Sequence, residues 1–458
     1  MNILNATKLT DYIPYYKRNL KVAIPVIIAH AGQVTIMMAD NMMVGWVNSV
    51  ELAAMSFSNA VYSIGMVFGM GFAIGITPLI GIAYGGGKFR KAASFFQNSL
   101  LLNLVCAVLC MVLMLLFSIF FDRMGQDETV ISIAKPVYGM LILSFLPQMI
   151  FFSGKQFLEG IGNTKIAMYI TISCNVLNII LNYMLIFGKF GCPALGAYGA
   201  GIATLICRSA MAVGFIAIFC FHHSFRRYFL FFSKMGFLWS RMKEMIRISA
   251  PVALQIGMEM LAFSFCTIMV GWVNSDSQAA HQIVLSLAVL TFMIVLGVSS
   301  ATTIRVSHQL GAGNFIGARK AGFASMHLAF AFMAITGTCF IVFRNYLPFL
   351  FNDEPQVVAI AAQLLVIGGI FQIFDGLQAV SMAALRGLAD TTKPMLIAFV
   401  SYIIVCLSVG YTLAFVVELG AVGIWMGYVV GLGTAAIWLA LRFNKKSKHL
   451  LTTSKFTL

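Results

Sequence analysis

Three acidic residues lie inside long apolar segments of this 458-residue chain: Asp40, Glu259 and Asp375. The other twelve of its fifteen Asp and Glu residues fall in tails, connections or segment ends. A charge at the centre of a bilayer costs at least ~2.5 kcal/mol, so carboxylates at that depth usually serve an ion or proton path. The plainer interpretation of each acid is a structural hydrogen bond between helices. These three residues are the first candidates for chemistry.

Each of these acids has an amide or an aromatic ring at a spacing that puts both side chains on one helix face. The neighbours are Gln33 for Asp40, Gln255 for Glu259 and Phe371 for Asp375; Gln372 and Gln378 flank the face of Asp375. A buried carboxylate beside amides suits two tasks. It can coordinate Na⁺ through oxygen, or it can hold a proton because burial favours its neutral form.

Other polar side chains also lie within apolar segments: Asn59, Asn175, Asn178, Asn182, Thr204, Arg208 and His281. A single Asn in a membrane helix often does no more than join it to a neighbouring helix. Asn178 and Asn182 are four residues apart, which places both on one face and favours a site. Arg208 is unusual at membrane depth, and the sequence does not identify its partner.

The elements that must position these residues are membrane helices. The chain is 60% hydrophobic and only 10% charged, against roughly 25% charged in soluble domains. An open strand cannot cross lipid with its backbone unpaired, and the alternating pattern of a membrane barrel is absent. We therefore expect an all-α integral membrane protein with twelve transmembrane helices. They are predicted near residues 20–47, 51–78, 94–120, 130–155, 166–187, 196–221, 246–273, 278–300, 321–345, 355–383, 394–417 and 420–442.

Basic residues predict the orientation of these helices. Lys and Arg gather in both tails and in alternate connections, such as 88–91 and 222–245. The intervening connections hold few, among them Arg123, Lys189 and Arg344. Since Lys and Arg favour the cytoplasmic side, both termini are expected in the cytoplasm and the protein in a bacterial inner membrane. The net charge of +15 therefore indicates topology, and no nucleic-acid partner is expected.

The chain repeats itself in order. MVGWVNS stands at 43–49 and again at 269–275, GGGKF at 85–89 matches GAGNF at 311–315, and LEGIGNT at 158–164 matches LRGLADT at 385–391. Six helices separate the copies, so the halves share one orientation. We expect two six-helix bundles related by a pseudo-two-fold axis along the membrane normal. The predicted parts are a first half at 1–221, a basic cytoplasmic linker at 222–245, and a second half with its tail at 246–458.

Enzyme motifs are not evident in the sequence. There is no Walker pattern, no HExxH, no GxSxG and no His/Cys ligand cluster. The Gly-rich turns at 85–87 and 311–313 do not join a strand to a helix, so they are interpreted as tight inner loops. We therefore expect a protein that is not an enzyme and that needs no cofactor.

The residues together resemble the multidrug and toxic compound extrusion (MATE) transporters, and the NorM-like bacterial branch most closely. The resemblance covers nearly the whole chain. It rests on MADNMMVG with Asp40, APVALQIGME with Glu259, FQIFDGLQ with Asp375, and ALRGLADT. It implies export of small cationic amphipathic drugs or dyes in exchange for Na⁺ or H⁺. It also implies a cation site at Glu259 and Asp375, and a cation or proton site in the first half at Asp40, Asn59, Asn178, Asn182 and Thr204.

Two departures from the family pattern leave the coupling ion open. Some relatives carry Tyr where this chain has Phe371, and some carry Asp where it has Asn182. An alternative function is a flippase of related architecture that moves lipid-linked substrates. Such a flippase would need a large cationic cavity, whereas the intramembrane charges here are mostly acidic. The remaining expected partner is membrane lipid, and the protein is expected to be monomeric.

Overall fold

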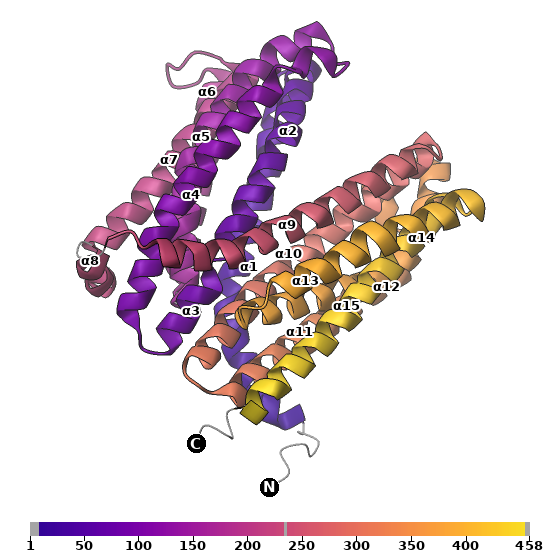
Figure 1. Cartoon of the computed structure of the whole chain (residues 1–458). Helices are drawn as coiled ribbons and strands as arrows, with labels where there is room; N and C mark the ends of the chain where they lie inside the picture. Colours follow the sequence, from indigo (N-terminus) through magenta and orange to yellow (C-terminus); the bar gives the residue numbers. More distant parts are fainter. Residues whose placement is uncertain (1–8, 233–235, 454–458) are drawn as a thin grey trace. The chain divides into compact units, whose positions relative to one another are not determined.

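A computed structural model of the chain describes residues 9–232 and 236–453, and within these ranges the chain is almost entirely helical (Figure 1). The helices of the first half are α1 (Ile13–Gly45), α2 (Ser49–Ile74), α3 (Thr77–Gly85), α4 (Phe89–Ser118), α5 (Glu128–Gly160), α6 (Thr164–Phe187) and α7 (Gly196–Phe221). Those that follow are α8 (Arg226–Phe232), α9 (Trp239–Gly271), α10 (Ser275–Gly311), α11 (Phe315–Val342), α12 (Pro355–Gly387), α13 (Thr392–Ala398), α14 (Leu407–Tyr411) and α15 (Gly420–Thr453).

Within the described residues, twelve helical spans are long and apolar enough to cross a membrane, which confirms the predicted number. The tenth is α12, and α2 and α3 count as one span because they nearly abut. Leu109, Leu113 and Leu116 on α4 are each more than half exposed. Such exposed apolar faces are costly in water and suit lipid. The chain is therefore a multi-pass membrane protein.

The eleventh span is not a regular α-helix. Between α13 and α14 the chain forms a π-helical segment, η5 (Phe399–Cys406), and a second one, η6 (Thr412–Val416), follows α14. Segments of this kind insert an extra residue into a turn and often mark functional sites. The apolar pattern of the sequence gave no signal for them.

The structure divides into two compact units. The first holds the described residues through Ile27, the turn Gly85–Gly87 and the described residues from Leu254 onward. The second holds Ile28–Tyr84 and the described residues of Lys88–Ala253. The sequence repeat divides the chain into two consecutive halves, whereas each of these units is a group of residues that pack together. Both α1 and α9 pass from one unit to the other two residues after an internal proline, at Pro25 and Pro251.

The linker predicted at 222–245 contains α8 and the first turns of α9. Its central part, residues 233–235, lies outside the described residues. The expectation that FLFFSKMGFLWSRM lies flat on the inner membrane surface falls partly on these residues and stays a prediction.

The repeated motifs adopt the same backbone geometry in both halves. Asn48 caps α2 by accepting a 2.7 Å hydrogen bond from the backbone N–H of Glu51. Asn274 caps α10 in the same way, accepting from Ser277 at 2.7 Å. The Gly-rich turns also match: Gly87 and Gly313 have φ of 69° and 73°, a left-handed region that glycine enters without steric cost. The repeat seen in the sequence is thus present in the local structure.

These caps lead to a stability prediction. We expect that Asn48→Ala and Asn274→Ala each lower the free energy of unfolding by about 1 kcal/mol, since each leaves a helix N-terminus uncapped. Asn163→Ala is the matched control, because Asn163 precedes α6 without a side-chain cap bond. Denaturation in detergent measures all three variants. Equal losses for the control and the two caps would contradict the assignment.

Close packing inside the first unit depends on small residues. A Cβ added at Gly337 in α11 would lie 2.4 Å from the carbonyl oxygen of Gly369 in α12. Helices in membranes commonly use such residues to bring their backbones together. This contact fixes α12, the helix that carries Asp375, against its neighbour.

Candidate functional site

Asp40 in α1 lies against two asparagines of α6. The side-chain amide of Asn182 donates to Oδ1 of Asp40 at 2.5 Å and to Oδ1 of Asn178 at 3.0 Å. Asn178 and Asn182 are buried, whereas Asp40 is half-buried. The second carboxylate oxygen of Asp40 makes no hydrogen bond to the described part of the chain. The structure therefore brings together Asp40, Asn178 and Asn182, as the sequence predicted.

The other predicted residues of this half are not hydrogen-bonded into the cluster. Gln33, Asn59 and Thr204 are half-buried and make no side-chain hydrogen bond within the described ranges. Asn175 is buried, and its amide nitrogen lacks a partner there. A Cβ at Gly32 would lie 2.8 Å from that nitrogen, so only glycine leaves room for the side chain.

Arg208 in α7 has partners that the sequence could not identify. Its Nη1 donates to the hydroxyl of Tyr62 and to Oγ of Ser144, both at 2.6 Å. Its guanidinium also lies 4.8 Å from the centre of the Tyr62 ring, a cation–π distance. Arg208 acts electrostatically on Asp40 without forming an ion pair with it. The guanidinium of Arg208 is therefore held by two hydroxyl oxygens and the face of an aromatic ring.

The second half places two acids in one polar cluster. Nε2 of Gln378 in α12 donates to Oε1 of Glu259 in α9 at 3.1 Å. Asp375, one turn before Gln378, lies within electrostatic reach of Glu259. Asp375 is 6% exposed and Gln378 is 1% exposed. Oε1 of Gln378 is buried and has no hydrogen-bond partner in the described part of the chain.

Phe371 lies one turn before Asp375 and belongs to an aromatic cluster. Its ring meets those of Trp425 and Tyr428 edge-on, at centroid distances of 5.4 and 5.8 Å. Gln255 is buried one turn before Glu259 in α9, without a side-chain hydrogen bond in the described residues. Of the five residues predicted for this half, Glu259 and Gln378 are hydrogen-bonded and Asp375 lies within electrostatic reach of Glu259. The other two, Phe371 and Gln255, are not hydrogen-bonded to them in the described residues.

His281 has a fixed structural role. The indole N–H of Trp425 donates to Nδ1 of His281 at 3.1 Å, so that nitrogen must accept. The proton then lies on Nε2, which donates to Oγ1 of Thr267 at 3.1 Å. Both ring nitrogens are satisfied by neutral groups. A second proton on this ring would break the bond to Trp425.

Three functional candidates were missed by the sequence analysis. Lys155 and Glu159 form a buried pair within α5, 3.8 Å apart, although both were assigned to a connection or a segment end. Arg386 acts electrostatically on Glu259 from the end of α12. The spacing of four residues between Lys155 and Glu159 was the feature of the sequence that could have indicated this pair. Arg386 had no comparable signal, because its relation to Glu259 depends on packing.

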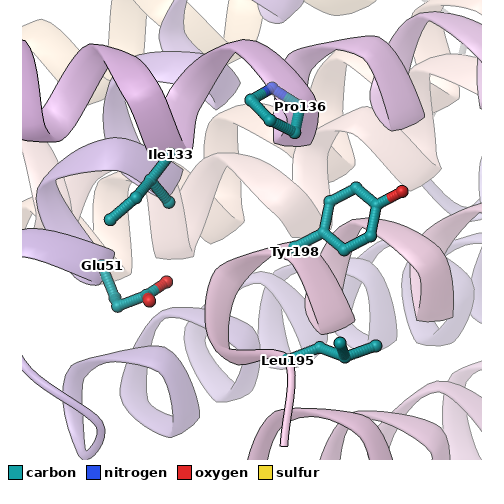
Figure 2. A pocket seen from close by; sticks show the side chains of 5 residues that line it. All are labelled: Glu51, Ile133, Pro136, Leu195 and Tyr198. Atoms are coloured by element: carbon teal, nitrogen blue, oxygen red, sulfur yellow. The ribbon is translucent and has the colours of Figure 1, made fainter. Parts of the chain in front are cut away.

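An open hollow of about 380 Å³ lies where α2, α5 and α7 begin. Figure 2 shows its lining residues, which are Glu51, Ile133, Pro136, Leu195 and Tyr198. Oε2 of Glu51 accepts a 2.7 Å hydrogen bond from the backbone N–H of Ala197. This carboxylate therefore caps α7, and none of the predicted site residues lines the hollow.

The two clusters offer oxygen ligands. Within residues 9–232 and 236–453, no group of three or more His, Cys, Asp and Glu side chains is placed to hold a metal ion. Carboxylate and amide oxygens suit hard cations, and a desolvated carboxylate also takes up a proton readily. Each half therefore carries a cluster of carboxylate and amide oxygens.

Comparison with known proteins agrees with this architecture. The MatE family profile matches residues 25–184 and 251–412. "Probable multidrug resistance protein NorM" of Agrobacterium fabrum is 31% identical over 456 residues, covering 97% of both chains. "Multidrug resistance protein MdtK" of Yersinia pseudotuberculosis is 31% identical over 411 residues, covering 88% of this chain and 89% of the relative.

Among solved structures, "Crystal structure of MATE in the bent conformation" has a TM-score of 0.88 to this fold at 20% identity. The match covers 98% of this chain and 100% of the other. The family profile covers both halves of the chain, and the solved structure shares its fold. The chain belongs to the MatE family, the MATE transporters.

Proposed function

We propose that this protein is a multidrug efflux antiporter that exports cationic amphipathic compounds in exchange for Na⁺ or H⁺. The observation that carries the proposal is the cluster in the second half, where Gln378 donates to Glu259 and Asp375 lies beside them. The relatives named NorM and MdtK support the drug-export part.

The proximity of the two acids favours binding of a cation. Two buried carboxylates that are close together cannot both stay ionised without a positive charge between them. Either Na⁺ bridges Glu259 and Asp375, or one of the two holds a proton. A tenfold inward gradient of the ion supplies about 1.4 kcal/mol for each ion that enters, which biases the cycle towards export.

Asp40 gives the first half an attraction for positive charge. Asp40 lies within the first span, and its carboxylate accepts a hydrogen bond from Asn182. The drug and the ion need not compete for one site. Coupling requires only that each binds a different state of the transporter more tightly. We propose that this exchange proceeds by alternating access.

The composition supports loose recognition of varied compounds. The chain contains 28 Met and 40 Phe. Flexible thioethers and flat rings can adapt to different apolar shapes, and ring faces attract cations. The intramembrane acids favour cationic over anionic cargo, so an anionic lipid-linked substrate is not proposed.

Everted membrane vesicles test the proposal. We expect vesicles that contain the protein to take up ethidium when a Na⁺ gradient or a H⁺ gradient is imposed. Each gradient is applied alone, with an ionophore that collapses it as the control. Uptake under neither gradient would contradict the proposed function.

The orientation has its own test. Reporter fusions at Lys446 and within residues 222–245 are expected to give cytoplasmic signals, because basic residues gather at both places. Fusions beside Lys189, in a connection with few basic residues, should give the opposite signal. A periplasmic signal at Lys446 would overturn the orientation.

A further inference from the structure

Two basic side chains lie against one aromatic ring where α4 and α9 begin. Nζ of Lys91 is 5.3 Å from the centre of the Phe95 ring, and the guanidinium carbon of Arg241 is 5.9 Å from the same centre. Both distances are within the range of a cation–π contact. Phe95 itself is buried. The ring therefore brings together two positive charges from helices that are far apart in the sequence.

The start of α9 is fixed at this place by a hydrogen bond to α4. The backbone N–H of Leu238, directly before α9 begins, donates to Oδ1 of Asn98 at 2.9 Å. Asn98 is buried, and its side-chain amide donates to the carbonyl oxygen of Ser94 at 2.8 Å, which fixes its orientation. Asn98 lies on the same face of α4 as Phe95, one turn later. This bond therefore holds the first turn of α9, with Arg241, beside the ring.

Neither cation is paired with an acid in the described part of the chain. None of the ion pairs within the described residues includes Lys91 or Arg241. Glu244, one turn after Arg241, is exposed and forms no ion pair with it there. Nη1 of Arg241 is buried and has no hydrogen-bond partner in the same residues. A guanidinium nitrogen left in this way costs free energy, so an anion that binds this half-buried side chain stabilises the junction.

The repeat shows what is missing at this junction. The sequence Arg-Lys-Ala lies near the start of both α4 and α11, at 90–92 and 319–321. In the second half Nζ of Lys320 lies 3.9 Å from a carboxylate oxygen of Asp11, just before α1. Lys91, the lysine of the first copy, has no acidic partner within the described residues. An anion from outside the chain can take the place at Lys91 that Asp11 has at Lys320.

The surroundings of the two cations suit a lipid headgroup. Lys91 and Arg241 each lie in the first turn of a membrane span, on the side predicted to be cytoplasmic. The side chains of residues 237–239, which are Phe, Leu and Trp, are exposed just before Arg241. Exposed tryptophan is typical of the level where the membrane meets water. Basic pockets between membrane helices on the cytoplasmic side are suited to the phosphates of anionic lipids.

We propose that Lys91 and Arg241 bind the phosphate group of an anionic phospholipid of the inner leaflet, between the starts of α4 and α9. The ammonium and guanidinium groups donate to the phosphate oxygens, and the planar fork of arginine can donate two parallel hydrogen bonds. The exposed apolar side chains of residues 237–239 lie against the acyl chains. The bound lipid thereby fixes the segment that joins the two halves to the membrane. This inference is independent of the proposed exchange of drug and cation.

Binding of radiolabelled phosphatidylglycerol to the purified full-length protein in neutral detergent tests the proposal without requiring transport. We expect saturable binding by the parent, and much weaker binding of phosphatidylcholine, whose choline offsets the phosphate charge. Arg241→Gln and Lys91→Gln should each weaken phosphatidylglycerol binding about tenfold, which corresponds to about 1.4 kcal/mol. Arg247→Gln is the matched control, because Arg247 is an exposed arginine of the same helix and removes the same charge. The control should bind as the parent does.

Inorganic phosphate separates a lipid site from a site for soluble anions. We expect that an equal concentration of inorganic phosphate does not displace phosphatidylglycerol, because only the lipid contacts the apolar side chains of residues 237–239. Displacement at equal concentration would overturn the lipid assignment. Unchanged affinity in Lys91→Gln would overturn the proposal, and because Lys91 is exposed this variant serves even where Arg241→Gln does not fold. Equal losses in Arg247→Gln and the site variants would also overturn it, since net charge alone would then attract the lipid.

Discussion

Replacing either acid of the second half should abolish gradient-driven export. We expect dye uptake by vesicles containing Glu259→Gln or Asp375→Asn to fall to the level of vesicles without the protein. Each variant removes one of two adjacent carboxylates, so the remaining one no longer needs a cation to offset its neighbour. A tenfold ion gradient supplies about 1.4 kcal/mol per ion exchanged, so the lost accumulation ratio is about tenfold for exchange of one ion per dye.

The same variants should remain folded and bind drug. Equilibrium dye binding to the purified protein measures this, and we expect parental affinity because the drug attraction is assigned to the other half. Asp353→Asn is the matched control, since Asp353 is exposed in the connection before α12. Parental pumping by either variant under both gradients would show that its residue does not couple.

Neutralising Asp40 should have the second largest effect. We expect Asp40→Asn to raise the half-saturating concentration of cationic dyes about tenfold or more, and to leave neutral compounds nearly unchanged. A contact with a charged group contributes about 1.5–3 kcal/mol, and the variant removes the charge. It retains an oxygen that can accept from Asn182, so the local packing is kept.

The control for this effect is Asp127→Asn in the same half, because Asp127 is exposed and its side chain makes no cap bond to α5. Transport is measured for one cationic and one neutral compound on each variant. If Asp40→Asn slowed both compounds equally, Asp40 would have a structural role instead of a role in cation recognition.

The features that the sequence predicted correctly all have local patterns. Twelve apolar stretches predicted twelve spans, because a spanning helix needs about 20 apolar residues whatever it packs against. The repeated motifs predicted matching caps at Asn48 and Asn274. Helical spacing predicted that Asn178 and Asn182 share a face, and their side chains are hydrogen-bonded to each other.

The features that were missed depend on contacts between distant segments. Arg208 gave no clue to Tyr62 or Ser144, because those partners come from other helices. The π-helical segment η5 has an ordinary apolar composition, so hydropathy cannot distinguish it from an α-helix. Arg386 resembled any basic residue at a helix end. Its relation to Glu259 appears only once α9 and α12 are folded.

If drug export and cation entry are obligatorily coupled, a drug gradient alone must move the cation, and a counter-transport measurement detects this movement. Purified protein is placed in liposomes that are loaded with ethidium and have equal Na⁺ and H⁺ on both sides. The outward dye gradient is predicted to drive a cation inward although no cation gradient is imposed. Entry of H⁺, or of Na⁺ supplied as a radioactive tracer, is expected with the parent but not with Glu259→Gln. Dye that leaves through the parent without any inward cation movement would contradict obligatory exchange.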